Sequence, residues 1–462
     1  MKKSAVLGVW LVLIGWWLLG CSEDFTDHPH PNQPPETFIS IFSDRDLHPT
    51  ISRQTLHWWG DDPDGMVVGY IYTFKDDAAN VTEWDSTAPA PDWIFTTQTT
   101  ETFTLKLAGS DSVYILRVKA IDDKGLADPT PAVQHFPIIN SRPSVTFPVG
   151  TDVPESTFTV ATFNWSGNDP DGADNIAKYQ YVLDDTSIAN AWHDLSPSTS
   201  SLTLTAADGL NEGRHVFYLR VIDIAGASSP IARMPRQANS VWYVREPKSN
   251  FLIIDDYNIA DQTAAFYKNI LQTIVGAVDV WDIKSKNQSQ EPPSAIAFYE
   301  TLKLFDRIFW YADAEPNLEK AQACIPKFLE NGGKIIMSTT FPEFSTNQGD
   351  PLDFSPVDSL ATKISRITRN QLIDPTSSFS ALGFPELKVS GAIIPNVFPL
   401  APKENSNVLY FLPESPGKWT GTPAVAVSDA QSSFVFFGLP LALLDGNSNI
   451  HVVFEKILND LF

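Results

Sequence analysis

The chain shows two successive patterns of apolar and polar positions after an apolar opening segment. Between about residues 37 and 245, apolar residues alternate with polar ones in short runs separated by turn residues. This period of two is typical of strands that bury one face, so we expect an all-β region there. From about residue 246, continuous apolar runs alternate with segments whose apolar residues recur at helical spacing. That second pattern predicts an α/β region with a doubly wound, mostly parallel sheet covered on both faces.

The all-β region contains an internal repeat. The segment 59–65 (WGDDPDG) returns as 165–172 (WSGNDPDG), and the segment 114–118 (YILRV) returns as 217–221 (FYLRV). An early tryptophan, followed later by such a strand leading to aspartate and glycine, resembles fibronectin type III and related immunoglobulin-like sandwiches. The resemblance implies a fold and carries no activity.

Two immunoglobulin-like sandwich domains follow from this resemblance, one in 37–140 and one in 141–245. We predict that Trp59 and Trp165 are buried equivalents in two separate cores, because each opens one copy of the repeated segment. Replacing a core tryptophan of this kind with alanine generally costs roughly 3–5 kcal/mol of stability.

Residues 246–462 hold the alternation of strands and helices, with a loop-rich insertion expected at about 341–404. The expected strands are 251–254, 278–283, 306–311, 334–338, 407–412, 423–428 and 433–438. A helix is expected around Tyr267 and Leu271, a second over 315–331, and a third at the end of the chain. Apolar residues line one face of this last helix, so we expect it to pack against the sheet.

Three stretches of this region resemble the flavodoxin-like fold of class I glutamine amidotransferases: the first strand (IIDD), 328–336 (FLENGGKII) and 436–440 (FFGLP). By that resemblance, catalytic members hold a nucleophilic cysteine on the tight turn after a strand, with a histidine–glutamate pair downstream. This chain has Ser-Thr-Thr at that turn (338–340), whereas Cys324 lies within a predicted helix and His451 opens another. The resemblance therefore implies the fold without the cysteine nucleophile.

Acidic residues collect at the predicted carboxyl ends of the strands in this region. Asp255 and Asp256 follow the first strand, Asp313 follows the third, and Ser338 ends the fourth. Open parallel sheets bind ligands at this edge, so these four residues form the candidate ligand site. The carboxylates could hold a cation or act as general acid and base, and they could equally cap neighbouring helices. No glycine-rich phosphate loop follows the first strand, so we expect no nucleotide.

Both copies of the repeat contain an Asp-Pro-Asp-Gly tetrad. These residue types at these positions favour a type I turn, which explains the tetrads without a metal. The neighbouring oxygen side chains would also suit calcium, although the spacing is not that of an EF-hand. The candidate calcium ligands are Asp61, Asp62, Asp64, Asp169 and Asp171. Calcium is the one cofactor that the sequence suggests.

Tryptophans outside the repeated segments suggest a glycan site. Trp84 and Trp192 correspond between the two copies, which favours a packing role for both. Trp58 and Trp93 are the tryptophans that the repeat explains least, and exposed tryptophans stack on sugar rings. Glycan binding is therefore an alternative function.

Two lysines, an apolar run and the sequence Leu-Leu-Gly-Cys at 18–21 open the chain. That order indicates a secretion signal in 1–20, and its ending resembles the lipobox of bacterial lipoproteins. The resemblance implies cleavage before Cys21 and lipidation of its thiol, so that the proline-rich segment 21–36 becomes a flexible tether to the first domain. The implied location is the bacterial outer membrane, on its periplasmic or its outer side. An uncleaved anchor helix is the alternative.

The formal net charge of −23 repels phosphate-rich partners and speaks against nucleic acid. The two cysteines, Cys21 and Cys324, cannot pair if Cys21 carries lipid. The leading hypothesis is a non-enzymatic, lipid-anchored envelope protein with a sandwich spacer and an α/β domain that binds a protein or another ligand. The alternatives are a glycan-binding surface lipoprotein and a hydrolase or transferase that uses the acidic strand ends.

Overall fold

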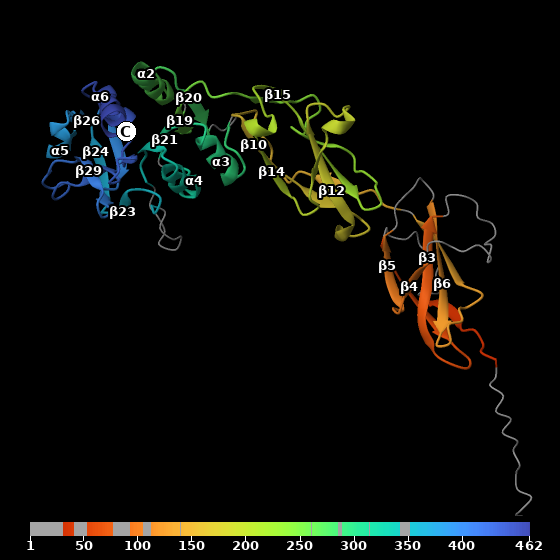
Figure 1. Cartoon of the computed structure of the whole chain (residues 1–462). Helices are drawn as coiled ribbons and strands as arrows, with labels where there is room; N and C mark the ends of the chain where they lie inside the picture. The colour runs from red at the N-terminus through yellow and green to blue at the C-terminus, as the bar shows by residue number, and fades with distance from the viewer. Residues whose placement is uncertain are drawn as a thin grey trace, which may run out of the picture. The chain divides into compact units, whose positions relative to one another are not determined.

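The computed structural model describes residues 31–40, 53–76, 93–104, 112–138, 140–259, 261–284, 289–313, 315–341 and 352–462. The chain divides into two compact units, Met1–Asn140 and Ser141–Phe462, and each is described by itself (Figure 1). The secretion signal, Cys21, most of the tether and Trp84 lie outside the described residues. Within the described part, no helix is long and apolar enough to cross a membrane.

The first unit consists of two antiparallel sheets, with the strand orders β1-β2-β5 and β4-β3-β6-β7. The strands are β1 (Glu36–Ser40), β2 (Arg53–Asp61), β3 (Val67–Asp76), β4 (Ile94–Thr96), β5 (Thr100–Thr104), β6 (Ser112–Asp122) and β7 (Ala132–Ile138). Alternate side chains of β2, β3 and β6 form one apolar core, which includes Leu56, Tyr70, Leu116 and Val118. The period of two in the sequence therefore corresponds to strands with one buried face.

The burial predicted for Trp59 is wrong, because its neighbour Trp58 occupies the core. Trp58 is 1% exposed and its ring meets that of Tyr70 edge-on, whereas Trp59 is 48% exposed and stacks on Phe38. The alternation of β2 turns the two side chains to opposite faces of the sheet. An alignment of the two repeated segments without a gap pairs Trp58 with Trp165, which is buried as predicted (3% exposed).

The second unit begins with strands that repeat the same arrangement. The order β13-β12-β16-β17 corresponds to β4-β3-β6-β7, and shorter sheets β10-β14, β11-β8 and β15-β18-β9 accompany it. The strands are β8 (Ser144–Thr146), β9 (Ser156–Thr157), β10 (Val160–Asn164), β11 (Ser166–Asn168), β12 (Ile176–Leu183), β13 (His193–Leu195), β14 (Ser201–Thr205), β15 (Gly213–His215), β16 (Phe217–Asp223), β17 (Ala232–Met234) and β18 (Trp242–Val244). The first half of the described chain is thus rich in β-strands.

The strand register also shows which tryptophans outside the repeated segments take equivalent positions in the two sandwiches. Trp93 precedes β4 in the first sandwich, and Trp192 precedes β13 in the second. Each ring lies beside a cation of the central strand, Lys119 at 5.6 Å from the Trp93 centroid and Arg220 at 4.2 Å from the Trp192 centroid. Trp192 therefore corresponds to Trp93 in the fold, whereas the sequence comparison pairs it with Trp84.

The rest of the second unit is an α/β region around a nine-stranded mixed sheet of order β20-β19-β21-β22-β31-β30-β29-β25-β26. Its strands are β19 (Phe251–Asp256), β20 (Asp279–Asp282), β21 (Arg307–Ala312), β22 (Lys334–Ser338), β25 (Leu372–Pro375), β26 (Leu387–Lys388), β29 (Asn407–Phe411), β30 (Ala424–Ser428) and β31 (Phe434–Phe437). The strands from β20 to β31 pair in parallel, and those from β31 to β26 pair antiparallel. The sheet is therefore half parallel, less than the sequence pattern predicts.

Helices cover both faces of this sheet, as Figure 1 shows. The first face packs against α2 (Thr263–Val275) and α6 (Ile450–Lys456), which continues into the π-helical turn Ile457–Leu461. The second face packs against α3 (Ala295–Leu302) and α4 (Leu318–Glu330). The terminal helix packs on the core as its apolar face predicts.

The region expected to be loop-rich holds more regular structure than its sequence suggests. It contains β23 (Val357–Leu360) paired with β28 (Leu400–Pro402), and β24 (Ile364–Thr368) paired with β27 (Ile393–Val397). It also contains α5 (Ser377–Ala381), and its strands β25 and β26 extend the main sheet. The region is thus an integral part of the α/β fold.

A short connector joins the second sandwich to the α/β region, and both ends of it are held. The buried carboxylate of Asp279 on β20 accepts hydrogen bonds from Lys248 N (2.8 Å), Ser249 N (2.9 Å) and Ser249 Oγ (3.0 Å). The guanidinium of Arg245 lies 4.0 Å from the ring centroid of Phe158 and donates to a backbone carbonyl of β20 (2.6 Å). Phe158 itself belongs to the core that lies under α3 and α4. Side chains of the sandwich and of the α/β region therefore share one packed interface.

Candidate functional site

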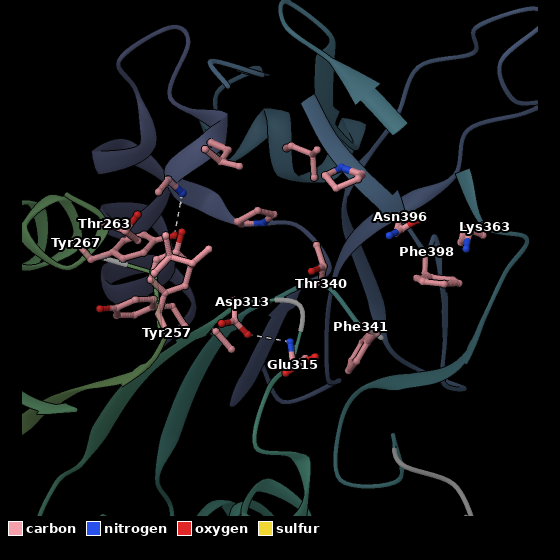
Figure 2. Close-up of a pocket in the computed structure, with 18 residues that line it drawn as sticks. Tyr257, Thr263, Tyr267, Asp313, Glu315, Thr340, Phe341, Lys363, Asn396 and Phe398 are labelled. Carbon is pink, nitrogen blue, oxygen red and sulfur yellow. Dashed lines mark hydrogen bonds between the residues drawn. The ribbon is translucent and has the colours of Figure 1, made fainter. Parts of the chain in front are cut away.

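A cavity of about 430 Å³ lies at the carboxyl ends of the parallel strands β19 and β21 (Figure 2). This is the edge at which the strand pattern predicts a ligand site. One wall comes from the residues after β19, from α2 and from the end of β21, and the opposite wall comes from Lys363 and residues 394–398. The residue Thr340, which follows β22, lies between these walls in Figure 2.

Three tyrosines form the first wall. The ring of Tyr311, on β21, lies 4.7 Å from that of Tyr267 on α2 and 6.1 Å from that of Tyr257 (centroid distances). The hydroxyl of Tyr267 accepts a hydrogen bond from Ala442 N (2.8 Å). The buried hydroxyl of Tyr311 lies beside the Asp255 carboxyl but meets no partner at good hydrogen-bond geometry among the described residues. This side of the cavity is thus lined by aromatic rings, and the Tyr311 hydroxyl lies next to the Asp255 carboxyl.

Lys284 joins two of the predicted site residues. Its ammonium lies 2.8 Å from a carboxylate oxygen of Asp313 and 3.7 Å from one of Asp256, and it also contacts the carbonyl of Glu315. Asp313 and Glu315 line the cavity, and Glu315 N donates to Asp313 Oδ1 (2.9 Å). The sequence reasoning missed Lys284, although its place just after β20 puts it at the same sheet edge.

Asp256 is buried and serves the start of helix α4. Its Oδ2 accepts hydrogen bonds from Trp310 Nε1 (3.1 Å) and from the backbone N of Asn317 (2.6 Å), the residue that caps α4. Burial raises the pKa of Asp256 to about 6, although these bonds and Lys284 act in the opposite direction. The capping alternative from the sequence thus describes its contacts.

Asp255 lies behind the tyrosine wall. Its Oδ1 accepts a hydrogen bond from Tyr257 N (3.2 Å). Burial raises the pKa of Asp255 to about 6, and the negative charge of Asp282 adds to the shift. This carboxyl is therefore next to the cavity through Tyr311 but does not line it.

Ser338 is buried and tied to the backbone. Its Oγ donates to Leu439 O (3.0 Å) and accepts from Leu441 N (3.1 Å), which fixes the end of β22 to the segment after β31. The next turn residue, Thr340, lines the cavity instead. Of the four predicted residues, Asp313 alone lines the cavity, and the other three support it from behind.

The cysteine and the histidine of this region lie on opposite faces of the sheet. Cys324 is buried on α4, where its thiol donates to Ala295 O (3.4 Å) and burial raises its pKa to about 11. His451 is exposed on α6, which packs on the other face. Neither residue lines the cavity.

The candidate calcium residues lie at the two tetrad turns. Asp61 and Asp64 are exposed, Asp62 and Asp171 are half-buried, and Asp169 is buried. Among the residues that the structure describes, no group of three or more acidic, histidine or cysteine side chains could hold a metal ion.

No protein-family model matches the chain, and no curated protein matches it. Distant structural similarity exists to fibronectin(III)-like modules of Clostridium thermocellum CbhA, with 13% identity, a TM-score of 0.20 and coverage of 46% of this chain and 95% of that one. The FN1–FN3 domains of chicken CNTN1 match with 14% identity and a TM-score of 0.19, covering 47% of this chain and 68% of that one. A two-domain fibronectin type III segment of chicken tenascin matches with 12% identity and a TM-score of 0.18, covering 44% and 97%. Fibronectin type III-like similarity thus spans roughly half the chain.

Proposed function

We propose that this chain is a lipid-anchored, non-enzymatic protein of a bacterial outer membrane whose α/β domain binds a ligand in the cavity. In this proposal the two sandwiches are the spacer between the lipid and the binding domain. The observation that carries it is the cavity of about 430 Å³ at the ligand-binding edge of the sheet. Pockets of roughly 300–1,000 Å³ with apolar walls and a few polar groups are typical of small-ligand sites.

The lining favours a ligand with an apolar body and charges of both signs, such as a short peptide. Figure 2 shows Asp313 and Glu315 in one part of the cavity and Lys363 beside Phe398 in another. A carboxylate such as that of Glu315 would receive an amino group, and Lys363 would receive a carboxylate.

The contacts of the candidate nucleophiles support binding over nucleophilic catalysis. A thiol whose pKa is raised to about 11 is protonated at neutral pH, so Cys324 is a poor nucleophile. The hydroxyl of Ser338 is engaged by two backbone groups. The exposed His451 is on the face of the sheet opposite Cys324 and does not line the cavity, so it is not placed as a base.

Filling the cavity tests this proposal. Thr340→Trp places a large ring among the lining residues and should abolish binding, because the apolar space is then occupied. We would titrate the full mature chain with the dipeptide leucyl-phenylalanine by calorimetry and repeat the titration with its acetylated, amidated form. Binding to the free dipeptide that falls at least tenfold for the blocked form, and is lost in Thr340→Trp, is the expected result.

Thr273→Trp is the matched control, because Thr273 is exposed on α2 and does not line the cavity. It should bind the dipeptide as the wild type does. Equal binding by wild type and Thr340→Trp would contradict a binding role for the cavity. Equal binding of the free and blocked dipeptides would contradict the charge pairing alone.

The anchor has its own test. Cys21→Ala should abolish incorporation of labelled palmitate and leave the signal uncleaved, since the lipobox cysteine is both the lipid acceptor and the new terminus. Fractionation of cells should then move the protein out of the outer-membrane fraction. Unchanged processing of the variant would show that the protein is not a lipoprotein.

A hydrolase or transferase is the second candidate, and one observation favours it. Carboxyls with a pKa near 6, such as Asp255 and Asp256, can both donate and accept protons near neutral pH. Any activity found by substrate screening should fall about a hundredfold in Asp255→Asn, because acid–base groups contribute that much or more. An activity that survives Asp255→Asn would remove this candidate.

A further inference from the structure

The outer face of the sheet β4-β3-β6-β7 in the first sandwich exposes apolar side chains along its edge. Phe95, on the edge strand β4, is 59% exposed and stands opposite Ile71 of β3. Ile71 lies between two core tyrosines of β3, so its side chain and that of Phe95 point away from the core. Trp93 precedes Phe95 by two residues, and its ring centroid lies 5.6 Å from Lys119 Nζ, which belongs to the same face. Trp93, Phe95 and Ile71 thus form an apolar row on this face.

The ring of Phe95 rests on Gly69 of β3. A Cβ atom at Gly69 would lie 2.6 Å from the nearest ring carbon, which is too close for any side chain. Gly69 is buried, in agreement with a ring that covers it from the outer face. The glycine therefore allows the ring to lie on the backbone of β3 while more than half of Phe95 stays exposed.

The same positions of the second sandwich are polar. The strand register matches three of them between the copies: Gly69 with Lys178, Ile71 with Gln180, and Phe95 with Asp194. Lys178 Nζ donates to Asp194 Oδ2 (2.8 Å), and Gln180 Nε2 donates to Asp194 Oδ1 (2.6 Å). The fold therefore does not require apolar residues at these positions, and an exposed apolar surface that the fold does not require is typical of an interaction site.

The apolar row has the chemistry that recognises sugar rings. The C–H groups of a pyranose carry a partial positive charge and pack on the negative face of an aromatic ring. Trp93 and Phe95 are two residues apart, roughly 7 Å along an extended chain, so successive units of one sugar chain can contact both rings. Lys119 and Arg117, on the outer face of β6, carry N–H donors that suit sugar hydroxyls.

The width and the charge of this surface favour a neutral polysaccharide over a protein or a polyanion. Lys119 stands directly opposite Ile71, so a charged side chain bounds the row on the side of β6. A stable protein interface covers about 800 Å² on each partner, around a centre that is poor in lysine. The formal net charge of −23 repels a polyanion.

We propose that the apolar row of the first sandwich binds a neutral polysaccharide, whose sugar rings stack on Phe95 and Trp93. The second sandwich lacks this site, because Asp194 stands where the first has Phe95. The row shares no residue with the cavity, so the two sites can be tested separately. The first sandwich is then a binding module as well as a spacer.

Affinity electrophoresis of the full mature chain in native gels tests this proposal. The gels contain hydroxyethyl cellulose, laminarin, galactomannan or dextran, which are all neutral, and gels with the polyanion alginate serve as the comparison. At least one neutral polysaccharide should retard the wild type, and Phe95→Ala should weaken that binding at least tenfold. Trp59→Ala is the matched control and should bind as the wild type does, because Trp59 is 48% exposed in the same sandwich but belongs to the other sheet.

A double variant separates binding from folding. Gly69→Lys together with Phe95→Asp gives the first sandwich the residues that the second has at these positions, where Lys178 and Asp194 form an ion pair. This variant should unfold in urea at nearly the same midpoint as the wild type, because an ion pair replaces an exposed ring. It should no longer be retarded by the polysaccharide.

Four results would overturn the proposal. Retardation by none of the neutral polysaccharides, or equal retardation of the wild type and the double variant, would show that the row is not a glycan site. Retardation by alginate alone would assign a polyanion to the chain instead. A dimer in sedimentation velocity that the double variant loses would assign the row to contact with a second copy of the chain.

Discussion

The two sandwiches share the structure around the tetrad turn but differ in the residues and regions next to it. In both, the second aspartate of the tetrad accepts a backbone hydrogen bond from the entering chain, as Asp64 does from Gln33 and Asp171 from Ser141. In both, a tryptophan of the repeated segment is buried beside a tyrosine of the neighbouring sheet. Both copies thus share the hydrogen bond that holds the entering chain and the tryptophan that packs between the two sheets.

The differences lie in charge and in what covers the sandwich. Lys124 stands beside the turn of the first sandwich, and Ala225 takes its place in the second. The second sandwich also sends Phe158 into the core of the α/β region. The tetrad turn is thus common to both sandwiches. The residue beside the turn and the region that packs against the sandwich differ between the two copies.

The largest expected effect concerns the paired tryptophans. Trp58→Ala and Trp165→Ala should each lower the stability of their own unit by roughly 3–5 kcal/mol, because each ring fills a core. Hydrogen–deuterium exchange mass spectrometry reads the two units separately. Trp59→Ala is the control and should cost less than about 1 kcal/mol, since Trp59 is half exposed. Equal losses of stability in Trp58→Ala and Trp59→Ala would contradict the equivalence of Trp58 and Trp165.

Phe158→Ala should cost about 3 kcal/mol and should affect the second sandwich and the α/β region together. Phe158 is 1% exposed, and its ring meets those of Trp281 (6.3 Å) and Phe305 (5.1 Å). Peptides of both regions should therefore exchange faster in the variant. Faster exchange confined to the sandwich would show that the two regions are stabilised independently.

The pH dependence of stability should contain a contribution from Asp169 of the second sandwich beside those of Asp255 and Asp256. Burial and neighbouring aspartates raise the pKa of Asp169, so the folded chain holds its proton to a higher pH than the unfolded chain does. Stability should therefore fall as the pH rises from about 4 through this higher pKa. Asp169→Asn should remove this part of the loss, which urea unfolding at a series of pH values would measure. If the free energy of unfolding changed with pH in the same way for the variant and the wild type, groups other than Asp169 would account for the loss.

The smallest effect concerns Lys124. Lys124→Ala, which removes the exposed ion pair with Asp64 beside the first tetrad turn, should lower the stability of the first unit in urea unfolding by less than about 1 kcal/mol. Lys178→Ala, which removes an exposed ion pair with Asp194 in the second sandwich, is the control. A loss of stability in Lys124→Ala well above that in Lys178→Ala would contradict this small contribution.

Much of the fold was predictable from the sequence, because buried strands need long apolar runs. The expected strands 407–412, 423–428 and 433–438 are confirmed as β29, β30 and β31. Their directions were not predictable, since an apolar run reads the same in parallel and antiparallel pairs. The choice between Trp58 and Trp59 failed for a similar reason: a shift of one residue moves a strand side chain to the other face.

The candidate site was predictable to the level of a sheet edge. Asp313 lines the cavity as expected, whereas Asp256 and Ser338 turn toward backbone groups of other elements. The sequence pattern fixes where a strand ends and says little about which long-range donor a carboxylate or hydroxyl meets. The second wall, with Lys363 and Asn396, comes from the segment expected to be loop-rich, and no local signal marks it.

The connector after the second sandwich has a practical consequence. Asp279 holds Lys248 and Ser249 through three hydrogen bonds, and Arg245 spans from the sandwich to β20. Proteases cleave where several consecutive residues are flexible, whereas these hydrogen bonds hold Arg245, Lys248 and Ser249 in place. The smallest fragment that folds with the cavity intact should therefore start at Ser141. A fragment that starts at residue 246 would lack Phe158 and would expose the apolar side chains of Trp281 and Phe305 to water.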